Sequence, residues 1–472
     1  MTPLLGLALT ALAAFAPRAS PSPSAPAPPP AAVEAQGAPV PPAPAAIEPP
    51  PAPGLEDLYR SILPRPIGDP TVFANEDASG QTTRTASGSR DDEARDALYL
   101  GTVQLTPAFH ALYVRAEGAL LDNAEPVEDH YYEMRPQIGA EVPVSTGFLR
   151  GAYHARIRRG SSFDLVESTI THLADFSLNL PLGGVGEITG AEHIARGVLE
   201  TAEVDPGREY FFRLGRFARN LHSLGVRLLP GGRADVSLGG SLDVVRVDDR
   251  AAFFDHERQS GTALIGYEVT PALRAGLGYS YTRIPFTVER PEAESHLHST
   301  FGELRGEILP LTDGNVSVGY ARQVSPNAGP GGTRFAGLTA AGRLEKSFTP
   351  SSSLTLTGTR APNVSAFEQN AFYVTSAVAV LLRAGLPGSL ALEAGAGYHR
   401  NDYRTVASSI GVPRRDAIRG WTVGLGRPFT RRAFIRADYR RDRRDSNIDA
   451  FDSRSNALTV QLGLGLFAAP LR

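Results

Sequence analysis

Apolar and polar residues alternate one by one along the chain from about residue 98 to the C-terminus. In NALTVQLGLGLF (456–467), every second residue is large and apolar, and most residues between them are polar or glycine. ADVSLGGSLDVV, SLALEAGAGYHR and AFIRADYRR show the same alternation. A period of two residues is typical of a strand with one apolar and one polar face. The pattern therefore predicts an all-β fold built from long, two-faced strands.

Short turns containing proline recur through this region at intervals of roughly 40 residues. They are centred near Pro143, Pro181, Pro230, Pro271, Pro310, Pro350, Pro387 and Pro428. Between successive turns lie two alternating segments and one longer, charged loop. The segments of about 10–13 residues suit tilted transmembrane strands, which need about 9–11 residues. A β-propeller blade repeats at a similar length, but it holds four shorter strands and carries Gly-His and Trp-Asp signatures that this chain lacks.

The alternating segments predict about 18 strands, with about 16 as the alternative. The predicted ranges are 109–120, 130–142, 146–158, 170–180, 185–196, 209–229, 234–246, 258–269, 273–285, 297–309, 315–324, 335–348, 353–361, 370–386, 389–401, 417–427, 432–441 and 455–467. An even number places both ends of the region on the side of the short turns, as in bacterial outer-membrane barrels. We predict a transmembrane antiparallel up-and-down β-barrel over residues 98–472. Pro136 lies inside one strand and indicates a bulge there, because proline removes a ladder donor.

Alternation alone would also fit a soluble β-sandwich. Three features favour a barrel whose apolar face meets lipid. So many strands without covering helices would need a very large core, and closure removes sheet edges that lipid cannot hydrogen-bond. Tyrosines, whose amphipathic rings suit a membrane interface, lie near segment ends; they are Tyr279, Tyr281, Tyr320, Tyr398 and Tyr403. We therefore expect the leucines of the last strand to face lipid.

Two further sets of residues follow from a lipid-facing wall. Interface anchors are predicted where rings or long basic side chains end an apolar face; they are Tyr279, Tyr281, Tyr398, Arg419, Trp421 and Arg427. The last strand resembles the C-terminal insertion signal of outer-membrane barrels, with Leu462, Leu464, Leu466 and Phe467 as its candidates. The departure from that pattern is AAPLR, which follows the aromatic residue. This resemblance implies the barrel-assembly machinery as a partner during insertion.

The polar faces of the strands carry charges of both signs. The predicted inward residues are Arg115, Glu117, Glu133, Arg135, Arg150, Arg156, Asp175, Asp243, Glu303, Arg305, Glu307, Arg343, Glu345, Glu393, Arg436, Asp438 and Arg440. One interpretation is a network that braces a wet lumen and carries no selectivity. The other is a charged track that passes a sugar polymer along exchangeable hydrogen bonds, with arginine pairing to uronate carboxylates.

The N-terminal part has a different composition. Residues 4–16, LLGLALTALAAFA, read as the core of a signal peptide (1–16) with Ala14-Phe15-Ala16 as its cleavage site; the alternative is a disordered alanine-rich start, since no Lys or Arg precedes them and Pro17 follows. Residues 17–54 read as a Pro/Ala-rich disordered spacer. Residues 55–97 begin with a short amphipathic helix, which either docks a partner or caps the barrel mouth, and continue as a mobile lead-in.

Composition and motifs argue against several other functions. The formal net charge is -3 and cysteine is absent, which disfavours nucleic-acid binding, a disulfide framework and a thiolate metal site. GPGG at 329–332 lacks the context of a phosphate loop. His296 and His298 could meet a metal with Glu294, but histidines at a strand entrance are far more often solvated. No motif arranges a nucleophile and base, so we predict no enzyme, no cofactor and no metal.

Residues 98–467 resemble the putative β-barrel porin-2 group, whose members occur with exopolysaccharide-export systems. The resemblance is carried by GTVQLTPAF, by Asn123 in LLDNAEP, and by VTPALRAGLGYSYTR and GSLALEAGAGYHRNDYR. It implies an outer-membrane barrel of a Gram-negative bacterium, with its N-terminal arm in the periplasm. It also implies a polysaccharide substrate and a periplasmic polysaccharide-export protein as a partner. A general or small-solute porin and a non-conducting scaffold barrel are the alternatives.

Overall fold

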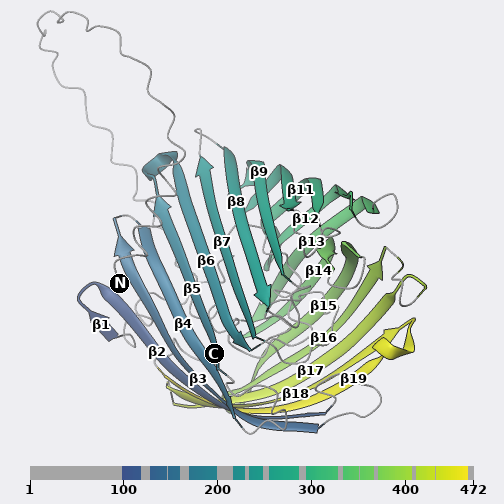
Figure 1. The fold of residues 1–472 in the computed structure, drawn as a ribbon. Helices are drawn as coiled ribbons and strands as arrows, with labels where there is room; N and C mark the ends of the chain where they lie inside the picture. The colour runs from purple at the N-terminus through teal and green to yellow at the C-terminus, as the bar shows by residue number, and fades with distance from the viewer. Residues whose placement is uncertain are drawn as a thin grey trace, which may run out of the picture. The chain divides into compact units, whose positions relative to one another are not determined.

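The computed structural model describes residues 98–117, 128–145, 147–159, 170–198, 216–228, 233–247, 255–285, 294–327, 333–349, 351–365, 370–404, 406, 411–430 and 432–465. Within these ranges the chain forms one antiparallel sheet whose strands follow one another around a wall (Figure 1). No helix among the described residues has the length and apolar character of a membrane span.

Most strands are long, and each from β2 onward overlaps one predicted segment, although β2 begins six residues before the predicted start and β18 ends five residues after the predicted end. They are β1 (Leu98–Leu100), β2 (Val103–Glu117), β3 (Glu128–Val144), β4 (Gly147–Arg159), β5 (Ile170–Pro181), β6 (Gly186–Val198), β7 (Arg216–Leu228), β8 (Ala234–Val247), β9 (His256–Thr270), β10 (Leu273–Ile284), β11 (Ser295–Leu309), β12 (Thr312–Ser325), β13 (Thr333–Thr349), β14 (Ser352–Val364), β15 (Phe372–Leu386), β16 (Leu390–Tyr403), β17 (Arg415–Thr430), β18 (Ala433–Ser446) and β19 (Ser453–Gly465). Two short 3-10 turns, η2 (Gly183–Val185) and η5 (Asp449–Phe451), lie between strands.

The sheet closes on itself because its last long strand pairs with its first. β19 is antiparallel to β2 from Asn456 opposite Glu117 to Gly465 opposite Ala108. Strands β2 to β19 therefore form a closed antiparallel barrel of 18 strands. This confirms the predicted fold class and strand number. The extra strand β1, which the sequence did not predict, forms a small hairpin with the start of β2.

The two ends of the barrel differ in the length of their connections. All eight predicted proline turns lie at the joins β3–β4, β5–β6, β7–β8, β9–β10, β11–β12, β13–β14, β15–β16 and β17–β18. At the β15–β16 join, Gly388 and Ser389 take the left-handed conformation, with φ of 76° and 60°, which a tight reversal requires. The described barrel begins and ends at this short-turn side, which is the periplasmic side in outer-membrane barrels.

Pro136 lies in β3 without the predicted bulge. Met134 faces Ile157 and Gln137 faces His154 on β4, so the register is the same on both sides of the proline. The ladder to β4 lacks only the pairings of Arg135 and Pro136. The bulge prediction is therefore wrong: the missing donor interrupts the ladder locally and does not shift it.

Several predictions lie outside the described residues. These are the signal peptide (1–16), the spacer (17–54), the lead-in with its helix (55–97), Asn123, Leu466 and Phe467. The segment 209–229 contains one described strand, β7, which begins at Arg216.

Candidate functional site in the lumen

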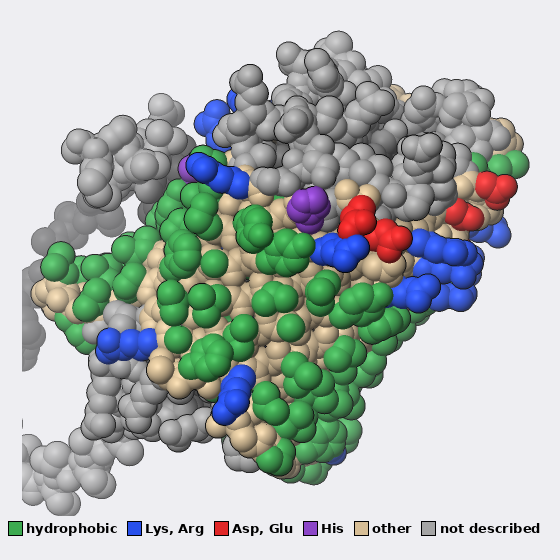
Figure 2. Space-filling model, turned by 90° about the horizontal axis from the view of Figure 1, so that it is seen from below, with side chains coloured by type: hydrophobic (Ala, Val, Ile, Leu, Met, Phe, Trp, Pro, Cys, Tyr) green, Lys and Arg blue, Asp and Glu red, His purple; other side chains and the backbone are tan. Residues whose placement is uncertain are grey.

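The two faces of the wall differ sharply in exposure along the last strand. Leu458, Leu462 and Leu464 of β19 are 41–43% exposed, whereas Thr459 and Gln461 are 7% and 1% exposed. The leucines therefore point away from the barrel axis and the polar residues point into it. Figure 2 shows the same on one face of the barrel, where hydrophobic side chains cover the wall and charged side chains gather mainly at its margins.

The inward face carries most of the predicted charges. The strand pairings and exposure pattern place these on it: Glu133, Arg135, Arg150, Arg156, Asp175, Asp243, Glu303, Arg305, Glu307, Arg343, Glu345, Glu393, Arg436, Asp438 and Arg440. Arg115 and Glu117 are on the outer face instead. Arg115 lies opposite the exposed Leu458 and pairs with Glu128 at 2.6 Å. Its strand position is in phase with Phe109 and Tyr113, which also face outward.

On β3 and β4, a buried glutamate binds two arginines. Glu133 is 1% exposed and accepts hydrogen bonds from Arg135, two residues further along β3, and from Arg158 of β4 at 3.1 Å. Nearer the short-turn end, Arg150 donates to Glu141 at 2.5 Å. Both pairs satisfy charges that would otherwise be left uncompensated inside the wall.

A second group of charges, with both arginines and acids, spans β7 to β11. Asp243 pairs with Arg219 at 3.0 Å and with Arg258 at 3.4 Å.

Closer to the short turns, Asp235 binds both Arg227, at 3.2 Å, and Arg274. Arg305 lies directly opposite Arg274 in the β10–β11 ladder. Arg305 lies between Glu303 and Glu307 on the inward face of β11, so guanidinium and carboxylate groups are balanced at this end of the lumen.

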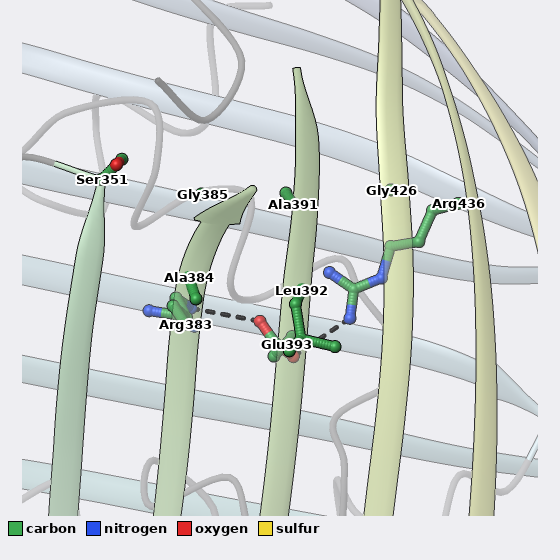
Figure 3. Close-up of a pocket in the computed structure, with 9 residues that line it drawn as sticks. All are labelled: Ser351, Arg383, Ala384, Gly385, Ala391, Leu392, Glu393, Gly426 and Arg436. Atoms are coloured by element: carbon green, nitrogen blue, oxygen red, sulfur yellow. Dashed lines mark hydrogen bonds and ion pairs between the residues drawn. The ribbon is translucent and has the colours of Figure 1, made fainter. Parts of the chain in front are cut away.

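A third group forms a continuous chain of ion pairs across β15, β16 and β18. Glu393 accepts a hydrogen bond from Arg383 at 3.1 Å and another from Arg436 at 3.0 Å. Arg436 also donates to Asp438 at 2.6 Å. Figure 3 shows the bridge across a hollow in the inner wall, with Arg383 and Arg436 reaching Glu393 from either side. Gly424 leaves room for it, because a Cβ there would collide with the Asp438 carboxylate.

One strand carries charge along most of its inward face. The inward residues of β18 alternate in sign from the short-turn end to the other end; they are Arg436, Asp438, Arg440, Asp442 and Arg444. Successive members are two residues apart, or about 6.6–6.8 Å along a strand. Arg440 and Asp442 pair at 2.8 Å, and Arg444 pairs with Asp416 of β17 at 3.4 Å. We call these five residues the β18 ladder.

The end of the β14–β15 pair bends into the lumen. Phe372 and Val374 are on the same strand face as the outward Val378, yet both are 0% exposed. They pack against Ala321 and Phe335, which belong to the inward face of β12 and β13. The β13–β14 ladder ends at Ala340 opposite Arg360, so the two strands separate beyond that point. The described ends of β14 and β15 therefore lie inside the wall formed by β12 and β13 and narrow the lumen there.

The other face of this inward end is also covered. Tyr373 stacks on Tyr403 with ring centroids 5.2 Å apart, and the Arg414 guanidinium lies 4.9 Å from the Tyr403 ring and 3.8 Å from the Phe451 ring. Arg414 pairs with Asp416 at 2.7 Å. Tyr403, which is 3% exposed, is therefore part of this interior cluster and not a residue of the membrane interface as predicted.

The other predicted interface rings lie on the outer face. Tyr279, Tyr398 and Trp421 are 40–44% exposed, and Tyr320 is 57% exposed. Arg419 and Arg427, also exposed, are at opposite ends of the outward apolar stretch of β17. A tyrosine pair that the sequence reasoning missed, Tyr113 and Tyr132, lies on the outer face of β2 and β3 with ring centroids 5.3 Å apart.

His296 and His298 also face outward, and each bonds a tyrosine of the neighbouring strand. The Tyr281 hydroxyl lies 2.8 Å from His296 Nδ1, and the Tyr279 hydroxyl lies 2.7 Å from His298 Nδ1. Glu294 instead accepts a hydrogen bond from Asn327 at 2.7 Å. Among the described residues, no group of three or more His, Cys, Asp or Glu side chains is placed to hold a metal ion.

The inward hairpin end and the Arg414 cluster are the parts of the lumen that the sequence reasoning did not find. Tyr373, Tyr403, Arg414 and Phe451 are far apart in the chain and belong to no motif. The available signal was local: FYVT, residues 372–375, breaks the alternation of β15 with consecutive bulky side chains. Consecutive apolar residues indicate a strand that is buried on both faces.

Residues 237–465 match the model of a family described as putative beta-barrel porin 2. The predicted resemblance is confirmed over this region, which runs from β8 to the end of β19. The closed barrel and its outward apolar face agree with this likeness, which places the region 237–465 beside β-barrel porins. No curated protein matches the chain.

Several solved structures align with most of this chain at low sequence identity. The outer membrane protein opdK from Pseudomonas aeruginosa is 11% identical, with 76% of this chain and 98% of that chain covered and a TM-score of 0.44. OccAB3 from Acinetobacter baumannii is 9% identical, with 76% and 99% covered and a TM-score of 0.42. A BenF-like porin from Pseudomonas fluorescens Pf-5 is 9% identical, with 77% and 98% covered and a TM-score of 0.44.

Proposed function

We propose that this porin is a conduit for the export of an exopolysaccharide, and that the β18 ladder is the track along which the polymer moves. The observation that carries the proposal is the regular alternation of arginine and aspartate on one inward strand face. Arginine binds carboxylates through two parallel hydrogen bonds, and the aspartates accept hydrogen bonds from sugar hydroxyls. A polymer that carries uronate groups fits both kinds of partner.

Pairing within the ladder would keep each binding step weak. Arg440 is already bonded to Asp442, and Arg436 to Asp438 and Glu393. A uronate carboxylate that reaches such an arginine replaces a carboxylate of the protein, so little free energy is gained or lost. Conduction requires binding that is favourable enough for entry and weak enough for release. A ladder of paired charges meets this requirement better than a row of unpaired arginines.

The inward end of β14 and β15 supports the second candidate, a small-solute porin. Phe372, Tyr373, Val374 and Thr375 occupy space on the lumen side of β12 and β13, which narrows the passage. A narrow passage suits small solutes. It is also compatible with an extended polymer chain, which needs only a thin path along one wall of the lumen. A non-conducting scaffold barrel is the third candidate. Catalysis has no part in any of them.

The composition of residues 17–54 supports a further part of the proposal, that this arm contacts a periplasmic polysaccharide-export protein. Pro-rich segments act as semi-rigid spacers and as recognition segments. The partner's identity follows from the family resemblance and from no contact in the described barrel.

Export can be tested in cells that depend on this protein for surface polymer. Arg436 and Arg440 are replaced together by glutamine, which removes two of the three positive charges of the ladder. The matched control is Arg322→Gln, because Arg322 is exposed on the outward face of β12. Surface polymer is measured beside the amount of heat-modifiable barrel in the outer membrane, so that a loss of export is separated from a loss of protein.

The proposal expects less surface polymer in the double variant, normal polymer in the control and equal barrel abundance in both. Unchanged surface polymer in the double variant would contradict the track. Polymer loss that follows barrel abundance would assign both arginines to bracing the wall alone. The small-solute porin would be favoured by two results together. The purified protein conducts ions in bilayers, and cells export the polymer without the protein.

A further inference from the structure

Three exposed arginines stand side by side on the outer face of the barrel, at the end with the longer connections. Arg419 of β17 lies directly opposite Arg443 of β18, and Arg443 lies directly opposite Arg454 of β19. All three side chains are exposed. We call them the arginine row.

The row concentrates positive charge that the described protein neutralises only in part. Neighbouring strands are about 4.8 Å apart, so the three guanidinium groups start from backbone positions within about 10 Å. Like charges directly opposite one another destabilise a sheet. Among the described acidic residues, Asp445 alone forms an ion pair with the row, at 2.6 Å from Arg443. An anion from outside the protein would relieve this repulsion.

The position of the arginine row on the barrel indicates which kind of anion can reach it. Tyr398 is directly opposite Arg419, and Trp421 lies two residues further along β17 toward the short turns. The Trp421 and Tyr439 rings contact each other, with centroids 5.3 Å apart. Outward tryptophan and tyrosine mark the level of the lipid headgroups, and long connections mark the external side. The arginine row is therefore at the headgroup level of the outer leaflet.

We propose that the arginine row binds the phosphate groups of an anionic lipid in the outer leaflet. Arginine binds phosphate through paired, charge-assisted hydrogen bonds. Three arginines on three adjacent strands span enough of the wall to hold a headgroup with two phosphates. Arg322 provides the contrast, because it is also outward and exposed but faces His298 and Ala336 across the ladders instead of other arginines.

The test measures binding of lipid A, a doubly phosphorylated glycolipid, to the purified full-length barrel in neutral detergent. Native mass spectrometry compares the wild type, the triple variant Arg419→Gln, Arg443→Gln and Arg454→Gln, and the control Arg322→Gln. Dephosphorylated lipid A is the matched ligand. Thermal unfolding with and without lipid A gives a second readout. Heat-modifiable gel mobility shows which variants have folded.

The proposal expects the triple variant to bind lipid A about tenfold more weakly or worse than the wild type, since several charge-assisted hydrogen bonds are lost. The control should bind lipid A as tightly as the wild type does. Dephosphorylated lipid A should bind the wild type weakly, with an affinity no higher than that of lipid A for the triple variant. Lipid A should raise the unfolding temperature of the wild type more than that of the triple variant.

Equal binding by wild type and triple variant would overturn the proposal, and so would equal loss in Arg322→Gln or binding that ignores the phosphates. Loss of a co-purifying protein, with lipid binding unchanged, would assign the row to a protein partner instead. If the triple variant does not fold, Arg454→Gln decides, because no described acidic residue pairs with Arg454. Its binding should fall, and unchanged binding would overturn the proposal.

Discussion

Phe335 and Phe372 meet edge to face inside the barrel, with ring centroids 6.4 Å apart and an angle of 73° between the rings. Phe335 is on the inward face of β13, but Phe372 is on the strand face that looks outward elsewhere along β15. The contact is possible only because the end of β15 lies inside the wall. Edge-to-face pairs add about 0.5–1.5 kcal/mol to the burial of their rings, so this contact helps to hold the constriction in place.

Replacing Phe372 with alanine should loosen the constriction. Truncation of a buried phenylalanine costs about 3–5 kcal/mol where the site cannot collapse, and here the loss falls on a strand end and not on the whole barrel. We expect single-channel conductance in planar bilayers to rise or to fluctuate between levels, with heat-modifiable mobility unchanged. Val378→Ala, on the same strand face but facing lipid, is the control and should conduct like the wild type. Wild-type conductance in Phe372→Ala would contradict the constriction.

Glu393 holds two arginines, so its neutralisation should destabilise the wall. Glu393→Gln leaves Arg383 and Arg436 without the carboxylate that bridges them, and the bridge is mostly buried, with the Glu393 side chain 13% exposed. The expected loss is about 3 kcal/mol in the free energy of unfolding, measured by denaturant titration in detergent. Glu303→Gln is the control, since Glu303 also lies on the inward face but has no ion pair with a described arginine. Equal stability of the two variants would show that the bridge contributes nothing.

Gly424→Ala probes the same chain of ion pairs from the neighbouring strand. The added methyl group would meet the Asp438 carboxylate and the Arg436 guanidinium, so one of them has to move. Such overpacking costs about 1–3 kcal/mol, seen as a lower unfolding temperature. At Gly261 on β9, nothing lies within 4 Å of an added Cβ. Gly261→Ala should therefore leave the unfolding temperature unchanged or raise it, and a loss as large as that of Gly424→Ala would contradict the packing described here.

Consecutive residues of β12 test which face meets lipid. Val318 is 49% exposed on the outward face, and Ser317 faces the lumen opposite Glu303. An arginine in place of Val318 should destabilise the barrel by about 2–4 kcal/mol, as expected for a charge near the bilayer midplane. An arginine in place of Ser317 can pair with Glu303 and should be tolerated. Unfolding in lipid vesicles measures the stability of both variants. A greater loss of stability for the arginine at position 317 than for the arginine at position 318 would contradict the assignment of the outward and inward faces.

The alternation of residues was enough to predict the number of strands, their approximate bounds and the face of most inward charges. It works because a period of two is the geometry of a strand, and a lipid-facing wall leaves few exceptions within the membrane. Outside the apolar belt both faces are polar, so charge no longer indicates direction. Arg115 and Glu117 were misplaced for this reason, although their phase with Phe109 points outward.

Other features depend on contacts between distant parts of the chain. The inward end of β15 requires β13 and β14 to separate, and the Tyr373–Tyr403 stack places Tyr403 inside. A local pattern does not report either event. Pro136 is a case in which a local signal misled the prediction. A proline within a strand predicted a bulge, but the pairing of β3 with β4 on both sides of Pro136 keeps the register unchanged. The β18 ladder was only half recognised, because Asp442 and Arg444 lie beyond the predicted end of that strand.

The claim that the β18 ladder is a polymer track is tested most directly by single-channel recording with an acidic oligosaccharide, oligogalacturonate, as the blocker. The wild type should show block events, and Arg440→Gln should shorten them, because the uronate loses a charge-assisted partner on the ladder. In the first control, Arg322→Gln should show block events as long as those of the wild type. In the second, a neutral oligosaccharide of equal length should behave the same in the wild type and in Arg440→Gln. Block events of equal length in wild type and Arg440→Gln, or no block at all in an open wild-type channel, would contradict the track.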